Sequence, residues 1–213
     1  MAKLNVVTAF NENSLKDHAH QMFNRVDKFW HPDIKLSAYH FDCALEAYSL
    51  PKTITCKNLE DVEEFNEFRS NMDVHNGTEN GTVEYNWRID TLLTAPKVFS
   101  LTEEAFKIAE ETKDGGWLLW MNTNVIPVDN LTSDFVHDFL PEGADIVHLS
   151  GDSVESTPDQ YSDPCFIAFN LDHQAPLDLL GDYRGAYESG EVLSYREWHE
   201  AFIFERLLNI YRA

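Results

Sequence analysis

Short apolar runs alternate with longer amphipathic stretches along this chain, a pattern that predicts strands separated by helices. The run Trp117–Met121 is apolar at every position, as expected for a strand covered on both faces. Ile34–His40 instead alternates apolar and polar residues, which is typical of a half-buried strand. The predicted strands are Leu4–Ala9, Ile34–His40, Trp117–Met121, Asp145–Leu149 and Cys165–Phe169.

Helix signals occur between these strands. Ser14 is suited to be an N-cap, and His31-Pro32 should end the helix that it starts. Pro96 can occupy the first turn of another helix, and residues 75–84 are expected to be a loop. The predicted helices are Ser14 to about Trp30, Leu59–Met72, Pro96 to about Thr112, Ala175–Tyr187 and Tyr195–Tyr211.

Strands alternating with helices predict a layered α/β fold with a mostly parallel sheet, in one domain over residues 1–213. In such sheets, ligands bind beyond the carboxyl ends of the strands. Asn122-Thr123-Asn124 follows the most apolar strand at such an end. Two interpretations stay open from position alone: the asparagines bind a ligand, or they only form a turn and hydrogen-bond the backbone.

Composition narrows the possible partners. The 16 basic and 37 acidic residues give a formal charge of −21, which disfavours direct binding to long nucleic acids. An acidic surface that only keeps the protein in solution is the plainer interpretation. The sequence contains no run of about 18 apolar residues, so no membrane span is predicted. The N-terminus does not resemble a signal peptide. Three widely spaced cysteines suggest reduced thiols, so we expect a cytoplasmic protein.

Four segments together resemble a group of small nucleotide-diphospho-sugar transferases of the GT-A fold, many of them encoded by bacteriophages. The resemblance extends roughly from Asn5 to Leu208 and depends on the order of the segments, since each alone is weak. The four are WRIDTLLTAPKVFSL at Trp87–Leu101, WLLWMNTNVIP at Trp117–Pro127, YSDPCFIAFNLD at Tyr161–Asp172 and YREWHEAFIFERL at Tyr195–Leu207. The resemblance implies a single GT-A-like domain with a mixed, mostly parallel sheet flanked by helices.

The family's buried strand typically ends in an Asp-x-Asp motif, whose carboxylates hold a Mn²⁺ or Mg²⁺ ion on the diphosphate of the donor. Here Asn122 and Asn124 replace both aspartates. Charge-assisted contacts are about twice as strong as neutral ones, so these amides should hold a metal weakly or not at all. They could instead hydrogen-bond a ribose or sugar hydroxyl. The resemblance therefore implies a donor site with no certain metal ligand.

Other positions keep or lose the family's chemistry. A family Ser-Glu corresponds to Ser162-Asp163, and a family Trp-His-Asp corresponds to Trp198-His199-Glu200, so an acid survives in both places. The arginine and histidine expected at the positions of Leu93 and Pro96 are missing.

The resemblance implies roles for the residues that remain. Asp163 would be the catalytic residue, as the general base for an attacking hydroxyl or as a ligand of a sugar hydroxyl. The donor would be bound by Thr8, Phe10, Asp42, Arg88, Lys97, Asn122, Asn124, His199 and Glu200. For each of them an ordinary structural role, such as loop packing, a turn cap or a solvated face, is the alternative.

Two main functions follow from this pattern. The first is an enzyme that moves a sugar from a nucleoside-diphosphate sugar to the hydroxyl of an unknown acceptor. The second is an inactive protein of the same fold that still binds a nucleotide or a partner. If the phage members are a guide, the acceptor is a modified DNA base or a surface glycan, and the location is the host cytoplasm. A weaker third possibility, suggested only by the charge, is mimicry of nucleic acid toward a basic partner.

Overall fold

The computed structural model describes residues 3–72, 76–78, 84–132, 138–149, 161 and 163–212. For Ala47, Asp163 and Pro164 it describes the backbone alone. The predicted loop at residues 75–84 lies largely outside the described residues. Within the described part, no helix is long and apolar enough to cross a membrane.

Six strands form one sheet in the order β3-β2-β1-β4-β6-β5. Strands β1 to β4 run parallel to one another, whereas β6 pairs antiparallel with both β4 and β5. The chain first builds outward from β1 to β3 and then returns to place β4 on the other side of β1. The strands are β1 Leu4–Phe10, β2 Lys35–His40, β3 Ile54–Asn58, β4 Trp117–Met121, β5 Ile146–Leu149 and β6 Asp163–Asn170.

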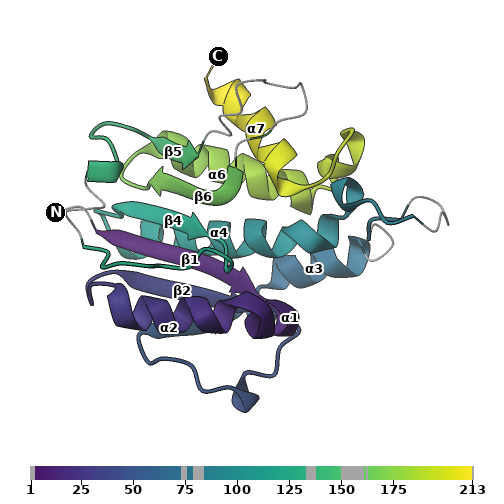
Figure 1. Cartoon of the computed structure of the whole chain (residues 1–213). Coiled ribbons are helices and arrows are strands. Elements are labelled where there is room, and N and C mark those ends of the chain that lie inside the picture. The colour runs from purple at the N-terminus through teal and green to yellow at the C-terminus, as the bar shows by residue number, and fades with distance from the viewer. Residues whose placement is uncertain are drawn as a thin grey trace, which may run out of the picture.

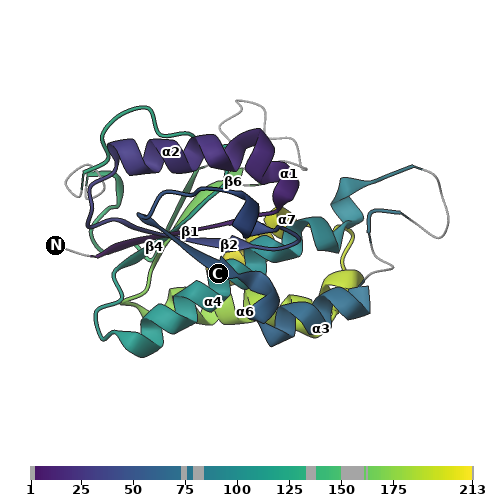
Figure 2. The same ribbon diagram turned by 90° about the horizontal axis from the view of Figure 1, so that it is seen from below.

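Helices cover both faces of this sheet (Figure 1). Helix α2 lies on one face, and α4 and α6 lie on the other, so the molecule has three layers (Figure 2). The helices are α1 Glu12–Ser14, a π-helix Leu15–Ala19, α2 His20–Phe29, α3 Glu63–Met72, α4 Thr91–Glu111, α6 Gln174–Glu188 and α7 Glu200–Tyr211. Short 3-10 turns lie at Leu45–Ala47, Leu59–Asp61, Trp87–Ile89 and Glu191–Ser194.

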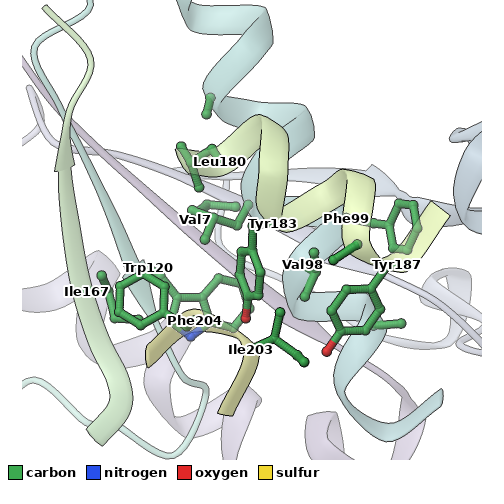
Figure 3. Packing of buried hydrophobic residues seen from close by; sticks show 14 of the residues in the cluster. Val7, Val98, Phe99, Trp120, Ile167, Leu180, Tyr183, Tyr187, Ile203 and Phe204 are labelled. Atoms are coloured by element: carbon green, nitrogen blue, oxygen red, sulfur yellow. The ribbon is translucent and has the colours of Figure 1, made fainter. Parts of the chain in front are cut away.

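The fully apolar strand β4 separates two hydrophobic cores. Its odd and even positions point to opposite faces, as the pleat of a strand requires. Leu118 and Trp120 join the core beneath α4, α6 and α7, whereas Leu119 and Met121 join the core beneath α2. Figure 3 shows Trp120 in the first of these cores, among side chains from β6, α4, α6 and α7. Both faces of β4 are buried, as its sequence predicts.

Several element boundaries differ from the sequence prediction. The first helical segment is capped by Asn11, whose side chain accepts from the Ser14 N–H, so Ser14 is the partner in a capping box and not the N-cap. Helix α4 begins at Thr91 because Asp90 caps it, which puts Pro96 inside the helix. The last helix begins at Glu200 and not at Tyr195. Strand β3 was not predicted.

Candidate functional site

A cleft of about 700 Å³ lies at the carboxyl ends of β1 and β4. The strand order reverses between these two strands, because β2 and β3 lie on one side and β6 and β5 on the other. Such a switch point is where open α/β sheets bind ligands. The position predicted from the Asn122 segment is therefore a hollow of the size that small-molecule sites have.

Side chains from both faces of the sheet line this cleft. The lining on the α2 face consists of Phe10, Asn11, Asn13, Ser14, Asp17 and His18. Ala9 and Phe41 also line the cleft, but they pack against the core beneath α4. The lining on the α4 face consists of Trp87, Leu93, Thr94, Pro96, Lys97, Tyr161, His199, Glu200 and Ala201. Strand β4 and the turn after it add Trp120, Asn122 and Thr123.

The π-helix Leu15–Ala19 presents two titratable side chains to the cleft. Asp17 and His18 are exposed and line it together. A π-turn inserts an extra residue into a helical turn, and such turns are frequent at functional sites. The sequence does not reveal the turn, because its composition fits an ordinary helix.

Asn122 lies in the cleft but its amide is held by the protein. Its Oδ1 accepts from Nε1 of Trp120 at 2.6 Å, and its Nδ2 donates to Sγ of Cys165 at 3.3 Å. Its backbone N–H donates to the carbonyl of Cys165 at 3.0 Å. The amide thus joins the end of β4 to the start of β6. This bonding is close to the second interpretation from the sequence, in which the asparagines only form a turn and hydrogen-bond the backbone.

His199 is also held on both sides of its ring. The residue is 1% exposed and caps α7, with Nδ1 accepting from the Phe202 N–H at 3.4 Å. Its Nε2 lies 2.9 Å from Oε2 of Glu197. Since Nδ1 accepts, Nε2 carries the ring proton and donates a hydrogen bond to the carboxylate. No ring nitrogen is therefore left to bind a metal.

Glu197 organises this side of the cleft. Besides His199, it accepts a hydrogen bond from the hydroxyl of Tyr161 at 2.8 Å. Burial by itself raises the pKa of Glu197, but the hydrogen bonds from His199 and Tyr161 outweigh it, so the pKa lies below its usual value. Burial and the same carboxylate raise the pKa of Tyr161. Glu197 is therefore an anion and Tyr161 a neutral phenol at neutral pH.

Lys97 is the one lysine or arginine among the described residues of the lining. It is 7% exposed, and its ammonium lies 5.2 Å from the ring centroid of Trp120. The first turn of α7 also reaches the cleft through Glu200 and Ala201. First-turn N–H groups lack partners within their helix and carry a partial positive charge. A buried cation and a helix N-terminus thus line one cleft, an arrangement that suits an anion.

The structure brings five of the predicted site residues to the cleft, namely Phe10, Lys97, Asn122, His199 and Glu200. Four others lie elsewhere. Thr8 is fully buried, and its hydroxyl has no hydrogen-bond partner among the described residues. Asp42 is exposed and paired with Arg69, both of its carboxylate oxygens lying 2.7 Å from one guanidinium nitrogen.

Arg88 is exposed and is not among the lining residues, and its Nε lies 3.4 Å from Oε2 of Glu197. Asn124 is exposed and does not reach the cleft. Asp163 is the first residue of β6, and its side chain lies outside the described residues. Because β6 runs antiparallel to β4, it begins at the edge of the sheet where β4 ends.

A divalent metal would need several oxygen or nitrogen ligands in one place. Among the residues that the structure describes, no group of three or more His, Cys, Asp or Glu side chains is arranged to hold one. The polar atoms of Asn122 and His199 already bond protein groups. The described donor set therefore does not fit a metal, and weak or absent metal use stays a prediction.

Trp87, Tyr161, Asp17 and His18 line the cleft but were not singled out from the sequence. The two aromatic residues begin segments used for the family resemblance, so their place in those segments was the available signal. Asp17 and His18 fall within the helix predicted from Ser14 to about Trp30. The sequence gives no sign that the helical turn around them is widened.

Comparison with solved structures supports the fold. The chain resembles the apo form of mouse xyloside xylosyltransferase 1 with a TM-score of 0.57, over 97% of this chain and 81% of that one. The two sequences are 9% identical, so the likeness concerns the fold alone. Together with the mostly parallel sheet flanked by helices, it confirms the predicted GT-A-like fold class. No protein-family model matches the chain, and no curated protein matches it.

Proposed function

We propose that this protein is a glycosyltransferase that moves a sugar from a nucleoside-diphosphate sugar to an acceptor hydroxyl. The observation that carries the proposal is that buried Lys97 and the first turn of α7 line the same switch-point cleft. A diphosphate carries the charge that this pair would neutralise. The partly exposed ring of Phe41 lines the same cleft and suits a nucleobase, whereas Phe10 lines it from a buried position with 1% of its surface exposed.

In the proposed transfer, the acceptor oxygen forms a bond to the anomeric carbon of the donor. The bond from that carbon to the diphosphate oxygen breaks, and its electron pair leaves with the diphosphate. Lys97 and the α7 N-terminus stabilise the charge that develops there. The hydroxyl proton goes to a carboxylate. We assign this role to Asp163, because β6 begins beside the end of β4, and we assign Glu200 to binding the donor.

The runner-up is a protein of this fold that binds a nucleotide without turnover. The hydrogen bonds of Asn122 and His199 favour this alternative. Both amide atoms of Asn122 and both ring nitrogens of His199 already bond protein groups and not a substrate. Nucleotide binding is common to both functions. Turnover distinguishes them, so binding and hydrolysis should be measured separately.

The test is calorimetric titration with UDP, GDP, ADP and CDP, each with EDTA and with Mn²⁺. We expect one of them to bind without metal, and Lys97→Met to weaken that binding by about tenfold to a hundredfold, as loss of a charged contact would. Lys97→Arg keeps the charge and should restore part of it. Lys107→Met, on an exposed face of the same helix, is the matched control and should bind as the wild type does.

Failure of all four nucleotides to bind would reject both functions. If the matching sugar nucleotides bind but are neither hydrolysed nor transferred, the binding protein is the better description. Binding that requires Mn²⁺ and ignores the loss of Lys97 would overturn the assigned role of this lysine.

A further inference from the structure

Two large apolar side chains stand exposed at one side of the cleft. Trp87 is 46% exposed and Leu93 is 59% exposed, and both line the cleft from the α4 face. We call these two residues the apolar rim. Single exposed apolar residues are normal on protein surfaces. Two that line one cleft beside its candidate binding groups need a more specific explanation.

The segment that carries the apolar rim is fixed by hydrogen bonds although its side chains are exposed. The carbonyl of Arg88 accepts from the Trp198 N–H at 2.7 Å, which ties Trp87 to the segment before α7. The N–H of Leu93 donates to Asp90 at 2.9 Å. The rim is therefore preorganised, which lowers the entropic cost of binding a ligand.

The aromatic surroundings of Trp87 also suit a ring. Its indole lies 4.7 Å from the His199 ring, and the ring of Tyr161 lies 5.1 Å from His199 on this side of the cleft. The imidazole of His199 is 1% exposed, so it supports these two rings from within the protein and adds little surface of its own. The apolar rim and these rings together offer a surface for the apolar face of a cyclic ligand.

Charges near the rim disfavour an anionic ligand. The guanidinium groups of Arg88 and Arg196 each lie 3.4 Å from a carboxylate oxygen of Glu197. Asp17 and Glu200 add two further carboxylates to the lining. Lys97 is assigned to the donor diphosphate. These two guanidinium groups stand against three carboxylates, those of Glu197, Asp17 and Glu200. The guanidinium of Arg88 also lies 5.0 Å from the ring centroid of Trp87. With the donor bound, the described groups around the remaining space therefore carry more negative than positive charge.

We infer that the apolar rim is the acceptor subsite and that it takes an uncharged ring compound, either a sugar ring or an aryl group attached to one. This inference rests on the proposed function, because it uses the donor assigned there. It narrows the unknown acceptor to neutral molecules that place an apolar ring face on Trp87 and Leu93 while a hydroxyl points into the cleft.

The test uses four probes in titrations monitored by ligand-observed NMR, with the nucleotide that binds present at saturation. The probes are methyl β-D-glucopyranoside, phenyl β-D-glucopyranoside, phenyl β-D-galactopyranoside and phenyl β-D-glucuronide. We expect at least one neutral probe to bind, and the anionic glucuronide to bind at least tenfold more weakly than phenyl glucoside. Binding of both methyl and phenyl glucosides indicates recognition of the sugar ring, and binding of phenyl glycosides alone indicates recognition of the aryl group.

Trp87→Ala and Leu93→Ala should each weaken the neutral probe by about fivefold or more, as loss of a ring contact does, whereas Trp87→Phe should retain most of the affinity. Ile210→Ala is the matched control, since Ile210 is 62% exposed and does not line the cleft. Nucleotide affinity and melting temperature should not change in any of these variants, which separates subsite loss from misfolding.

The inference is overturned if no neutral probe binds, if the glucuronide binds as tightly as the glucoside, or if Trp87→Ala binds as the wild type does. These outcomes differ from failure of the proposed function. Nucleotide binding without glycoside binding rejects the subsite alone, whereas rim-dependent glycoside binding without nucleotide binding rejects the donor and leaves a carbohydrate-binding cleft.

Discussion

At the scale of single residues, Glu197 connects the parts of the α4-face lining. Its carboxylate contacts Tyr161 and His199 by hydrogen bonds and lies near the guanidinium groups of Arg88 and Arg196. Buried charges are stable only where such partners surround them. Glu197 is therefore a positioning residue, since it holds the aromatic rings of the cleft through their polar atoms.

The lowered pKa of Glu197 makes its contribution to stability depend on pH. A carboxyl whose folded pKa lies below its unfolded value stabilises the protein at pH above the unfolded value, about 4.5, and loses this contribution as the pH falls through the folded value. Glu197→Gln should therefore lower the free energy of unfolding by roughly 1–3 kcal/mol at pH 7. Urea titrations from pH 7 to pH 3.5 should show this difference shrinking below about pH 4.5.

Glu110→Gln removes an exposed charge from the last turns of α4 and is the control for the change in net charge. It should leave the free energy of unfolding nearly unchanged at pH 7. A Glu197→Gln deficit that is the same at every pH would contradict an ionised, hydrogen-bonded carboxylate at this position.

At the scale of elements, the cleft depends on where helices begin. The N-caps Asn11, Asp90 and His199 all lie at or beside it. The first N–H groups of a helix have no acceptor within that helix. Each of these side chains accepts a hydrogen bond from one such N–H and fixes the angle at which the chain enters the helix. The cap of α4 has a second role, because Asp90 also accepts from the hydroxyl of Tyr85 at 2.9 Å.

Asp90→Ala should lower the free energy of unfolding by about 1–2 kcal/mol, because α4 loses its cap and the Leu93 N–H its acceptor. Asp90→Asn keeps an acceptor and should lose less. Urea denaturation measures both. Equal stability of the alanine variant and the wild type would show that the 84–93 segment is not held by this residue.

The sequence predicts most elements here but not all of their ends. Strands such as β4 are determined by their own apolar residues. Strand β3 was missed because Ile54–Asn58 is an edge strand with one buried residue, so it lacks a hydrophobic pattern. The start of α4 was misplaced because Pro96, common in first turns, lies inside this helix at the cost of a hydrogen bond.

The sequence predicts where the cleft lies but only some of the residues that line it. A buried strand with polar residues after it marks the end of β4 as a ligand edge, and the cleft is there. The surroundings of that edge depend on long-range packing. Trp87 and Tyr161 reach the cleft through contacts with the segment before α7, which no local pattern reveals.

At the scale of the whole molecule, the formal charge of −21 acts on stability as well as on partners. Like charges repel one another in the compact state more than in the expanded chain. At about 10 mM salt the Debye length is near 30 Å, so most surface carboxylates interact. Salt that screens them should therefore favour the folded state.

We expect the melting temperature to rise between about 10 and 200 mM NaCl, by roughly 2–4 °C for each 1 kcal/mol of relieved repulsion. Differential scanning fluorimetry at pH 7 measures this change. KCl should give the same shift, because screening depends on ionic strength and not on the cation. A fall in melting temperature would mean that attractive ion pairs, such as those of Arg184, outweigh the repulsion.

The reversed direction of β6 has a consequence for how sites in such sheets are sought. A scan that inspects only the residues after each strand finds Asn122 behind β4 but passes over Asp163, which opens β6 at the same edge. In a sheet with one antiparallel strand, the binding edge contains the carboxyl end of the neighbouring parallel strand and the amino end of the antiparallel strand. Residues just upstream of a late strand therefore belong in the first round of mutagenesis.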